Sequence, residues 1–142
     1  MAKAWIIVAA LLGAGAVAIG AYHAHGLEKS LAKRGLDAAE VAKQMHNADV
    51  AVKYQMYHAL AIFGIGSLLT RSGRAGTIVG SSAALLMLLG VAGFSGGLYA
   101  MVFDLARLHW AVVPVGGLLM ILGWLALGIA GCFVMVGKSP SK

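Results

Sequence analysis

The sequence predicts an all-α integral membrane protein, an up-and-down bundle of four transmembrane helices with an interfacial amphipathic helix between the first two. Two observations support this prediction. The 142 residues are 61% hydrophobic and 11% charged, with a mean hydropathy of +0.87, and a soluble chain of this size could not bury so much apolar surface. The second observation is a succession of stretches without any charged side chain, namely residues 4–22, 54–70, 75–103 and 110–137.

These uncharged stretches set the expected spans. About 20 helical residues cross about 30 Å of hydrocarbon. The second stretch is short, so its helix is expected to begin near Val50, with Lys53 extending to the interface. The predicted helices cover about residues 4–24, 50–70, 75–103 and 110–137. Together they use nearly the whole chain, which predicts a single membrane domain over residues 1–142.

The first predicted helix carries a stripe of small residues at spacings of four and three: Ala9, Gly13, Ala16 and Gly20. Such stripes let helix backbones approach closely where lipid provides no hydrophobic drive. Lys3 before an apolar run imitates a signal peptide, but the run is longer than a signal sequence needs, so we expect a retained helix. Gly26 is expected to end it.

Residues 27–52 form the only long hydrophilic passage and hold four of the five acidic residues. Asp37 and Glu40 have the spacing of a helix cap followed by an acid at the third helical position. A weakly apolar stripe then follows helical spacing: Ala38, Val41, Met45, Ala48 and Val52. This pattern predicts an amphipathic helix on the membrane surface over about residues 37–50, which passes directly or through a bend into the second span, and a flexible polar loop is the alternative.

The later connections are short. Arg71 and Arg74 flank a tight turn, and Pro114 falls near the first turn of the fourth helix, where its missing N–H costs least. Four spans place both termini on one side, with five basic residues there against six on the other. The short Arg-containing turn favours termini in the cytoplasm. The basic residues are scattered among connections, so membrane orientation and lipid head groups explain them better than nucleic acid does.

All five histidines fall near one membrane face in this topology. Tyr54, Gln55 and His58 enter the second helix together, and polar side chains are expected to face protein or water there because hydrocarbon disfavours them. A structural belt of interfacial polar and aromatic residues accounts for this pattern. In that interpretation His58 hydrogen-bonds a neighbour and fixes the register of the helices.

A metal or haem site is a functional alternative. His25 and His58 could approach each other across adjacent helices, because neutral imidazoles bind zinc, copper, nickel or iron. Further ligand candidates are His23, His46, His109 and Asp104. The sequence requires no cofactor.

Two more alternatives concern transport and assembly. Intramembrane His and Tyr can line a proton or solute path, although the opposite half offers few polar groups. Glycine stripes, including Gly93 with Gly97 and Gly116 with Gly117, indicate a structural or accessory subunit that associates with a second copy or a larger complex. An enzyme is disfavoured because the chain lacks a nucleophile elbow, a phosphate loop and a dinucleotide fingerprint.

Four segments resemble, in order, the signatures of one known family. They are residues 20–27 (GAYHAHGL), 54–61 (YQMYHALA), 94–99 (FSGGLY), and 114–117 (PVGG) followed by Gly123 and Trp124. The family is domain of unknown function 423, the YgdD-like bacterial inner-membrane proteins, with eukaryotic relatives among uncharacterised transmembrane proteins. His23 and Gly97 depart from its pattern, so we assign His23 no family-wide role.

The resemblance implies a four-helix protein of the bacterial inner membrane and implies no activity. It also implies a set of signature polar residues: His25, Tyr54, Gln55, His58, Ser95 and Tyr99. We predict that these six side chains form one hydrogen-bonded cluster near the loop-rich face, the candidate ligand-binding site. The expected partners are the lipid bilayer and, through the glycine and alanine stripes, a second copy or a larger membrane complex.

Overall fold

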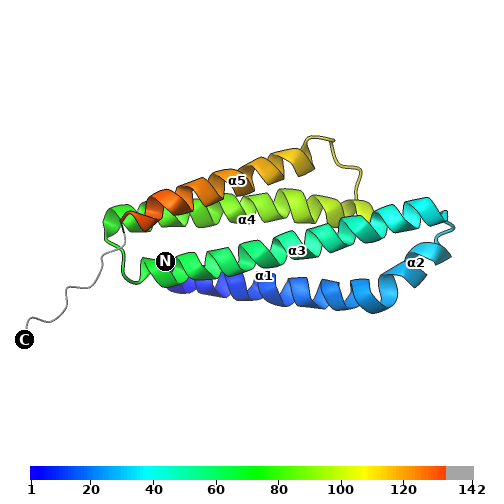
Figure 1. Cartoon of the computed structure of the whole chain (residues 1–142), viewed down its shortest axis with the longest axis horizontal. Coiled ribbons are helices and arrows are strands. Elements are labelled where there is room, and N and C mark those ends of the chain that lie inside the picture. The colour runs from blue at the N-terminus through cyan, green and yellow to red at the C-terminus, as the bar shows by residue number, and fades with distance from the viewer. Residues whose placement is uncertain (134–142) are drawn as a thin grey trace, which may run out of the picture.

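The computed structural model describes residues 1–133, and every regular element in that range is a helix. Four long helices lie side by side (Figure 1): α1 (Ala2–Tyr22), α3 (Ala38–Leu69), α4 (Arg74–Val102) and α5 (Val112–Gly131). A short helix, α2 (Glu28–Lys33), continues α1 through a π-helical turn, η1 (His23–Leu27). The part of the fourth predicted helix beyond residue 133 lies outside the described residues.

The helix that begins after Asp37 does not stop near residue 50. The Asp37 side chain accepts a hydrogen bond from the Glu40 amide at 2.9 Å, which confirms the predicted cap. From there α3 continues through Leu69 as one helix of 32 residues, because no glycine or proline interrupts it before Gly64. Residues 38–50 therefore form the first part of α3, so the predicted segment passes directly into the second span and is not a separate helix.

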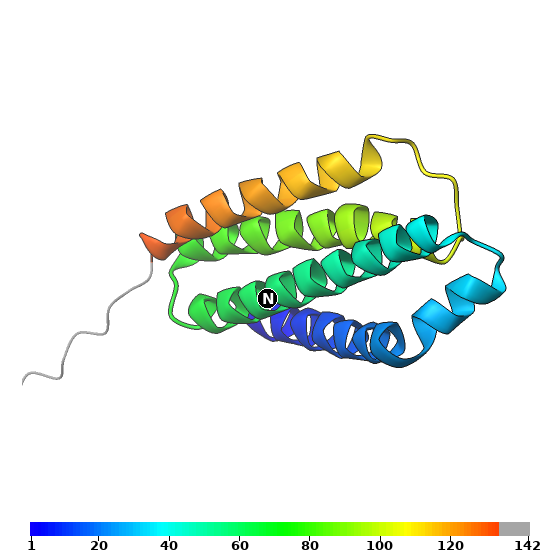
Figure 2. The same cartoon turned by 45° about the vertical axis from the view of Figure 1, so that its right-hand side comes forward.

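Gly26 does not end the first helix either. The chain passes through η1 and bends into α2 (Figure 2), and it turns only at Gly35, whose φ of 75° is left-handed. The small size of Gly26 serves packing, since a Cβ atom there would lie 2.9 Å from Cε2 of Tyr22. The prediction that Gly26 breaks the helix was wrong because a π-helical turn accommodates it.

Close backbone packing joins only consecutive long helices within the described chain: α1 with α3, α3 with α4, and α4 with α5. Their directions alternate, and in Figure 1 they follow one another from α1 at the bottom to α5 at the top. The helix α5 therefore has one close neighbour, and much of its remaining surface is open. Leu118, Ile121 and Leu125 on α5 are 55%, 59% and 62% exposed.

Glycines bring α4 and α5 into direct backbone contact. A Cβ atom at Gly116 would overlap the backbone nitrogen of Phe94 and lie 2.7 Å from the carbonyl carbon of Gly93. At Gly90 and Gly123 it would lie 2.6 Å from the Cγ atoms of the opposing methionines. The stripes of small residues thus serve helix contact within the chain.

Two apolar clusters lie along the long axis. The larger joins α1, α3 and α4 and includes Ile62, Ile65 and Met87, all at most 1% exposed. The smaller, at the α2 end, includes Leu27 and Leu31. The polar side chains described below lie on α3 and α4 between these clusters in sequence, at positions 55–58 and 95–99.

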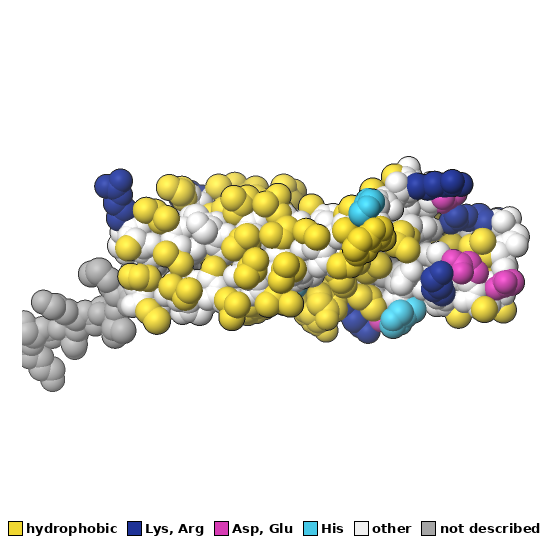
Figure 3. Space-filling view, turned by 90° about the horizontal axis from the view of Figure 1, so that it is seen from above, with side chains coloured by type: hydrophobic (Ala, Val, Ile, Leu, Met, Phe, Trp, Pro, Cys, Tyr) yellow, Lys and Arg dark blue, Asp and Glu magenta, His cyan; other side chains and the backbone are white. Residues whose placement is uncertain are grey.

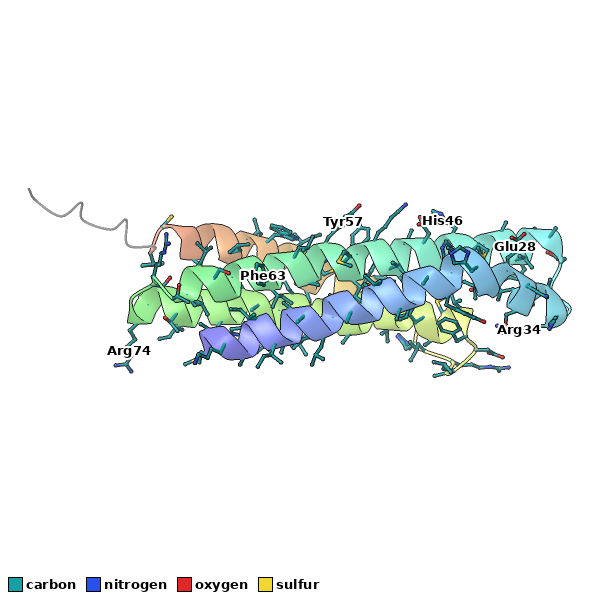
Figure 4. The ribbon with its side chains drawn as sticks, turned by 90° about the horizontal axis from the view of Figure 1, so that it is seen from below. Glu28, Arg34, His46, Tyr57, Phe63 and Arg74 are labelled. Atoms are coloured by element: carbon teal, nitrogen blue, oxygen red, sulfur yellow. The ribbon has the colours of Figure 1, made fainter. Side chains whose placement is uncertain are left out.

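The outer surface matches a membrane protein. Three helical stretches are long and apolar enough to cross a membrane: Ala2–Lys33, α4 and α5. On the face in Figure 3, apolar side chains cover the middle, and acidic side chains appear only in the half of the molecule that carries α2. Figure 4 shows the same separation, with Arg74 at one end and Glu28 and Arg34 at the other. The helix α3 is not among the three stretches because its middle carries Lys53, Gln55 and His58.

The α2 end is closed by an arginine. Arg34 Nη1 donates a 2.8 Å hydrogen bond to the Val102 carbonyl at the end of α4, and its Nη2 lies 3.6 Å from the Asp104 carboxylate. Asp104 has a φ of 54°, so it adopts the left-handed conformation that ends the helix. This contact joins the end of α2 to the end of α4 and to the start of the link 103–111.

Candidate functional site

Gln55 connects three helices. It is 7% exposed on α3, and its Nε2 donates to the Leu12 carbonyl of α1 at 2.7 Å. Its Oε1 accepts from the Tyr99 hydroxyl of α4 at 2.9 Å. Gly15 makes room for the amide, since a Cβ atom there would lie 3.1 Å from Nε2. Both ends of the buried amide are therefore bonded, as a polar group in an apolar interior requires.

His58 lies one turn further along α3 and faces α5. It is 3% exposed, and its Nδ1 lies 2.7 Å from the Tyr54 carbonyl. Because a carbonyl only accepts, Nδ1 carries the proton and Nε2 is the acceptor. Nε2 receives the indole N–H of Trp124 at 3.2 Å. The neutral imidazole thus has both nitrogens bonded, and this bond joins α3 to α5.

Ser95 and Tyr54 make different contacts. Ser95 is completely buried on α4, and its hydroxyl has no hydrogen-bond partner within residues 1–133. Tyr54 is 43% exposed and contributes its backbone carbonyl to His58, while its ring packs against Phe94 with centroids 4.9 Å apart. Neither side chain therefore joins the bonded groups.

The structure does not unite the six predicted residues in one hydrogen-bonded cluster. Gln55 bonds Tyr99, and His58 bonds the Tyr54 carbonyl, so two separate groups form. His25 lies exposed on η1 and shares no hydrogen bond with either group in the described chain. The neighbouring His23 instead donates to the Met45 carbonyl at 3.1 Å and ties η1 to α3.

Trp124 is the main partner that the sequence did not assign to the site. A signal for it exists, because an indole N–H in an apolar helix needs an acceptor. The Leu12 carbonyl had no such signal, since any backbone carbonyl of α1 could serve Gln55. It became the partner because Gly15 allows the Gln55 amide to approach α1 at that level.

The candidate metal ligands do not converge. Across residues 1–133, no group of three or more His, Cys, Asp or Glu side chains could hold a metal ion. His58 has both nitrogens bonded, His23 bonds a carbonyl, and Asp104 faces Arg34. His25 shares no site with them. The geometry gives no support to a haem or metal site built on His25 and His58.

A lateral groove opens beside His58 between α3, α4 and α5. Its cavity volume is about 430 Å³, and its lining is mainly apolar and aromatic. The lining includes Tyr54, His58, Phe94, Pro114, Ile121 and Trp124. The groove reaches the surface of the molecule, since Ile121 and Trp124 are 59% and 49% exposed. Its chemistry suits a hydrophobic occupant.

These features define an all-helical membrane protein whose helices are tied by buried hydrogen bonds and glycine contacts. The chain belongs to the DUF423 family, described as "Protein of unknown function", whose model matches residues 19–117. That range contains Gln55, His58, Ser95 and Tyr99, whereas Trp124 follows it. The family expected from the sequence motifs is thereby confirmed.

Curated relatives cover almost the whole chain. A UPF0382 membrane protein from Staphylococcus haemolyticus is 41% identical, with 95% of this chain and 99% of the relative aligned. The UPF0382 inner membrane protein YgdD of Escherichia coli is 32% identical, with 96% and 94% aligned. YwdK of Bacillus subtilis is 31% identical, with 90% and 95% aligned. No solved structure matches the chain significantly.

Proposed function

We propose that this protein is a four-span accessory subunit of the bacterial inner membrane that holds a transmembrane helix of a partner in the groove beside His58. The observation that carries the proposal is the open side of α5. Among the described helices it packs closely only on α4, and the groove that it leaves against α3 is apolar, aromatic and open to the surface.

Membrane placement follows from helix lengths. At 1.5 Å per residue, the 32 residues of α3 extend about 48 Å, well beyond the roughly 30 Å hydrocarbon layer. The uncharged part, residues 54–69, and the turns just before it would cross the bilayer beside the three apolar stretches, which makes four spans. The first turns of α3, together with α2, would then project from the membrane with Glu28, Glu40 and Lys43. Residues 1–142 would form one membrane domain.

Orientation follows from the basic residues. Lys3, Arg71 and Arg74 lie at the end of the molecule that carries the N-terminus and the α3–α4 turn. No acidic residue precedes Glu28 or lies between Asp49 and Asp104, so this end is purely basic among the described residues. The positive-inside rule counts only Lys and Arg, and the opposite end carries six of them, so the short turn that holds Arg71 and Arg74 is what favours the cytoplasm for this end. The E. coli relative is named an inner membrane protein, which supports the same membrane for this chain.

An accessory role fits the site better than transport. The buried polar groups of Gln55 and His58 already form hydrogen bonds within the protein. From His58 towards the α3–α4 turn, the core between α1, α3 and α4 is built from apolar side chains such as Ile62, Ile65 and Met87. A proton or solute path needs polar groups or water along its length, and this half of the described interior offers no such series.

Photo-cross-linking in native membranes tests the proposal. A benzophenone side chain at Ile121 would face the groove, and one at Ile7 of α1, which is similarly exposed, is the matched control. We expect a discrete protein adduct from position 121 and none from position 7. An adduct of twice the chain mass would identify a second copy, and another mass would identify a different subunit. Protein adducts absent from position 121, or equal at both positions, would refute the proposal.

A further inference from the structure

A second cavity, of about 630 Å³, lies where the start of α3 faces the link between α4 and α5. It differs from the lateral groove because charges of both signs line it. Glu40, Lys43 and Gln44 come from α3, while Asp104, Arg107 and His109 come from the link. Leu98, Met101 and Val113 supply an apolar floor from the neighbouring parts of α4 and α5.

From this cavity we propose a second binding site, one for a zwitterionic phospholipid whose head group carries a primary ammonium, such as phosphatidylethanolamine. The link lies at the expected depth of the head groups. Trp110 on the link is 80% exposed, and tryptophan favours the membrane interface. The apolar floor continues from this level towards the bilayer, where the acyl chains of a lipid would lie.

Donors for the phosphate come from the link. Arg107 forms no ion pair with any residue in the range 1–133, so its guanidinium is available to an anion. The Nδ1 atom of His109 accepts the Ala111 amide at 3.3 Å, which leaves the proton of the neutral ring on Nε2. Both side chains line the cavity. They can therefore donate to the same phosphate group.

Acceptors for the ammonium come mainly from α3. The Nε2 of Gln44 donates to Glu40 at 2.7 Å, whereas its Oε1 is buried and lacks a partner in the described chain. A buried acceptor without a donor is unfavourable, and because Gln44 lines the cavity, a turn of its amide that presents this oxygen to a donor in the cavity would remove that cost. Glu40 and the exposed carboxylate of Asp104 add negative charge to the same cavity.

The unpaired Gln44 oxygen also selects the head group. A primary ammonium carries three N–H donors and can satisfy this oxygen while it faces the two carboxylates. A choline group has no N–H, and a glycerol head group has no positive charge. Phosphatidylethanolamine therefore fits the cavity better than phosphatidylcholine or phosphatidylglycerol with the same acyl chains.

Native mass spectrometry of the whole protein in mild detergent tests this proposal, with dioleoyl forms of the three lipids added at equal concentration. We expect the wild type to retain phosphatidylethanolamine on the order of tenfold more tightly than the other two, as bonds to charged groups allow. Gln44→Leu and Arg107→Gln should remove the preference. Arg74→Gln, at the opposite end of the molecule, is the matched control and should keep it.

The ranking of lipids is measured on the wild type, so it does not depend on whether a variant folds. Equal retention of all three lipids, or preference for phosphatidylglycerol, would overturn the proposal. Full preference retained in a folded Gln44→Leu protein would also overturn it. Soluble phosphoethanolamine that displaces the lipid at the same concentration would show that acyl chains contribute nothing and would overturn the assignment to a lipid. None of these outcomes bears on the partner groove at Ile121.

Discussion

Replacing Gly116 with alanine should separate α4 from α5. The added methyl group would meet backbone atoms of the opposite helix, Phe94 N and the Gly93 carbonyl carbon, rather than a side chain that could rotate away. The Gly93 carbon lies 2.7 Å from the new position, whereas ordinary contact begins at 3.4 Å. The whole of α5 must therefore move outward locally, since neither backbone can yield alone.

The expected loss of stability follows from two opposing effects. Overpacking of a close contact costs about 1–3 kcal/mol, and a rigid backbone obstacle places this site at the upper end. Alanine regains up to about 1 kcal/mol over glycine inside a helix. The net effect of Gly116→Ala is then a loss of about 2 kcal/mol in the free energy of unfolding. Gly128→Ala is the control on the same helix, because no heavy atom lies within 4 Å of its Cβ position.

Equilibrium unfolding in mixed micelles of mild detergent and dodecyl sulfate, followed by tryptophan fluorescence, measures both variants. Gly128→Ala should unfold at the wild-type midpoint or later, and Gly116→Ala clearly earlier. The hydrogen bond from Trp124 to His58 should weaken in Gly116→Ala, because Trp124 moves outward with α5 while His58 stays on α3. If the two variants proved equally stable, close backbone contact would not be what holds α5.

The same assay checks three further side chains, and hydrogen exchange checks a fourth. Gln55→Leu removes the bonds to α1 and to Tyr99 and should lower stability by about 1–2 kcal/mol, whereas Tyr99→Phe removes one bond and should lower it by about 1 kcal/mol. Ser95→Ala should leave stability unchanged or raise it by up to about 1 kcal/mol, because its hydroxyl has no partner among residues 1–133; a clear loss would contradict this. Arg34→Gln removes the donor to Val102, and since the ion pair with Asp104 is exposed, the cost should be about 1 kcal/mol, seen as faster hydrogen exchange at the end of α4.

Hydropathy predicted the apolar helices because a helix that crosses the bilayer must be apolar, whichever helices it packs against. It did less well at the connections, where local backbone geometry decides. Gly26 was expected to stop a helix, yet the chain continues by adding a residue to one turn, a choice that no composition reveals. Residues 37–50 have the amphipathic pattern of a surface helix, but the same pattern suits a helix whose apolar face packs on α2.

For the candidate site, the sequence likewise identified the polar residues but not their partners. Gln55 and His58 were identified because buried polar side chains in an apolar helix need partners, and both have them. Their partners were not predictable, since those depend on the rotation of each helix about its axis. His58 follows Gln55 by three positions on α3, which turns the two side chains about 60° apart, so one meets α1 and α4 while the other meets α5. His25 lies within the π-helical turn η1, where the extra residue changes the direction of the side chains that follow, and its side chain is exposed.

The ties between helices explain how an open row can be stable in a bilayer. Lipid supplies no hydrophobic force that would drive helices together, so each neighbouring pair needs its own close packing or hydrogen bond. Gln55 supplies the bonds from α3 to α1 and α4, and the glycines around Gly116 supply the contact between α4 and α5. With α5 held by α4 and by one bond from Trp124 to His58, the row needs no contact between α5 and α1 to remain assembled. The outer face of α5 is therefore not required for folding, and an apolar helix face that folding does not use is free to receive a partner.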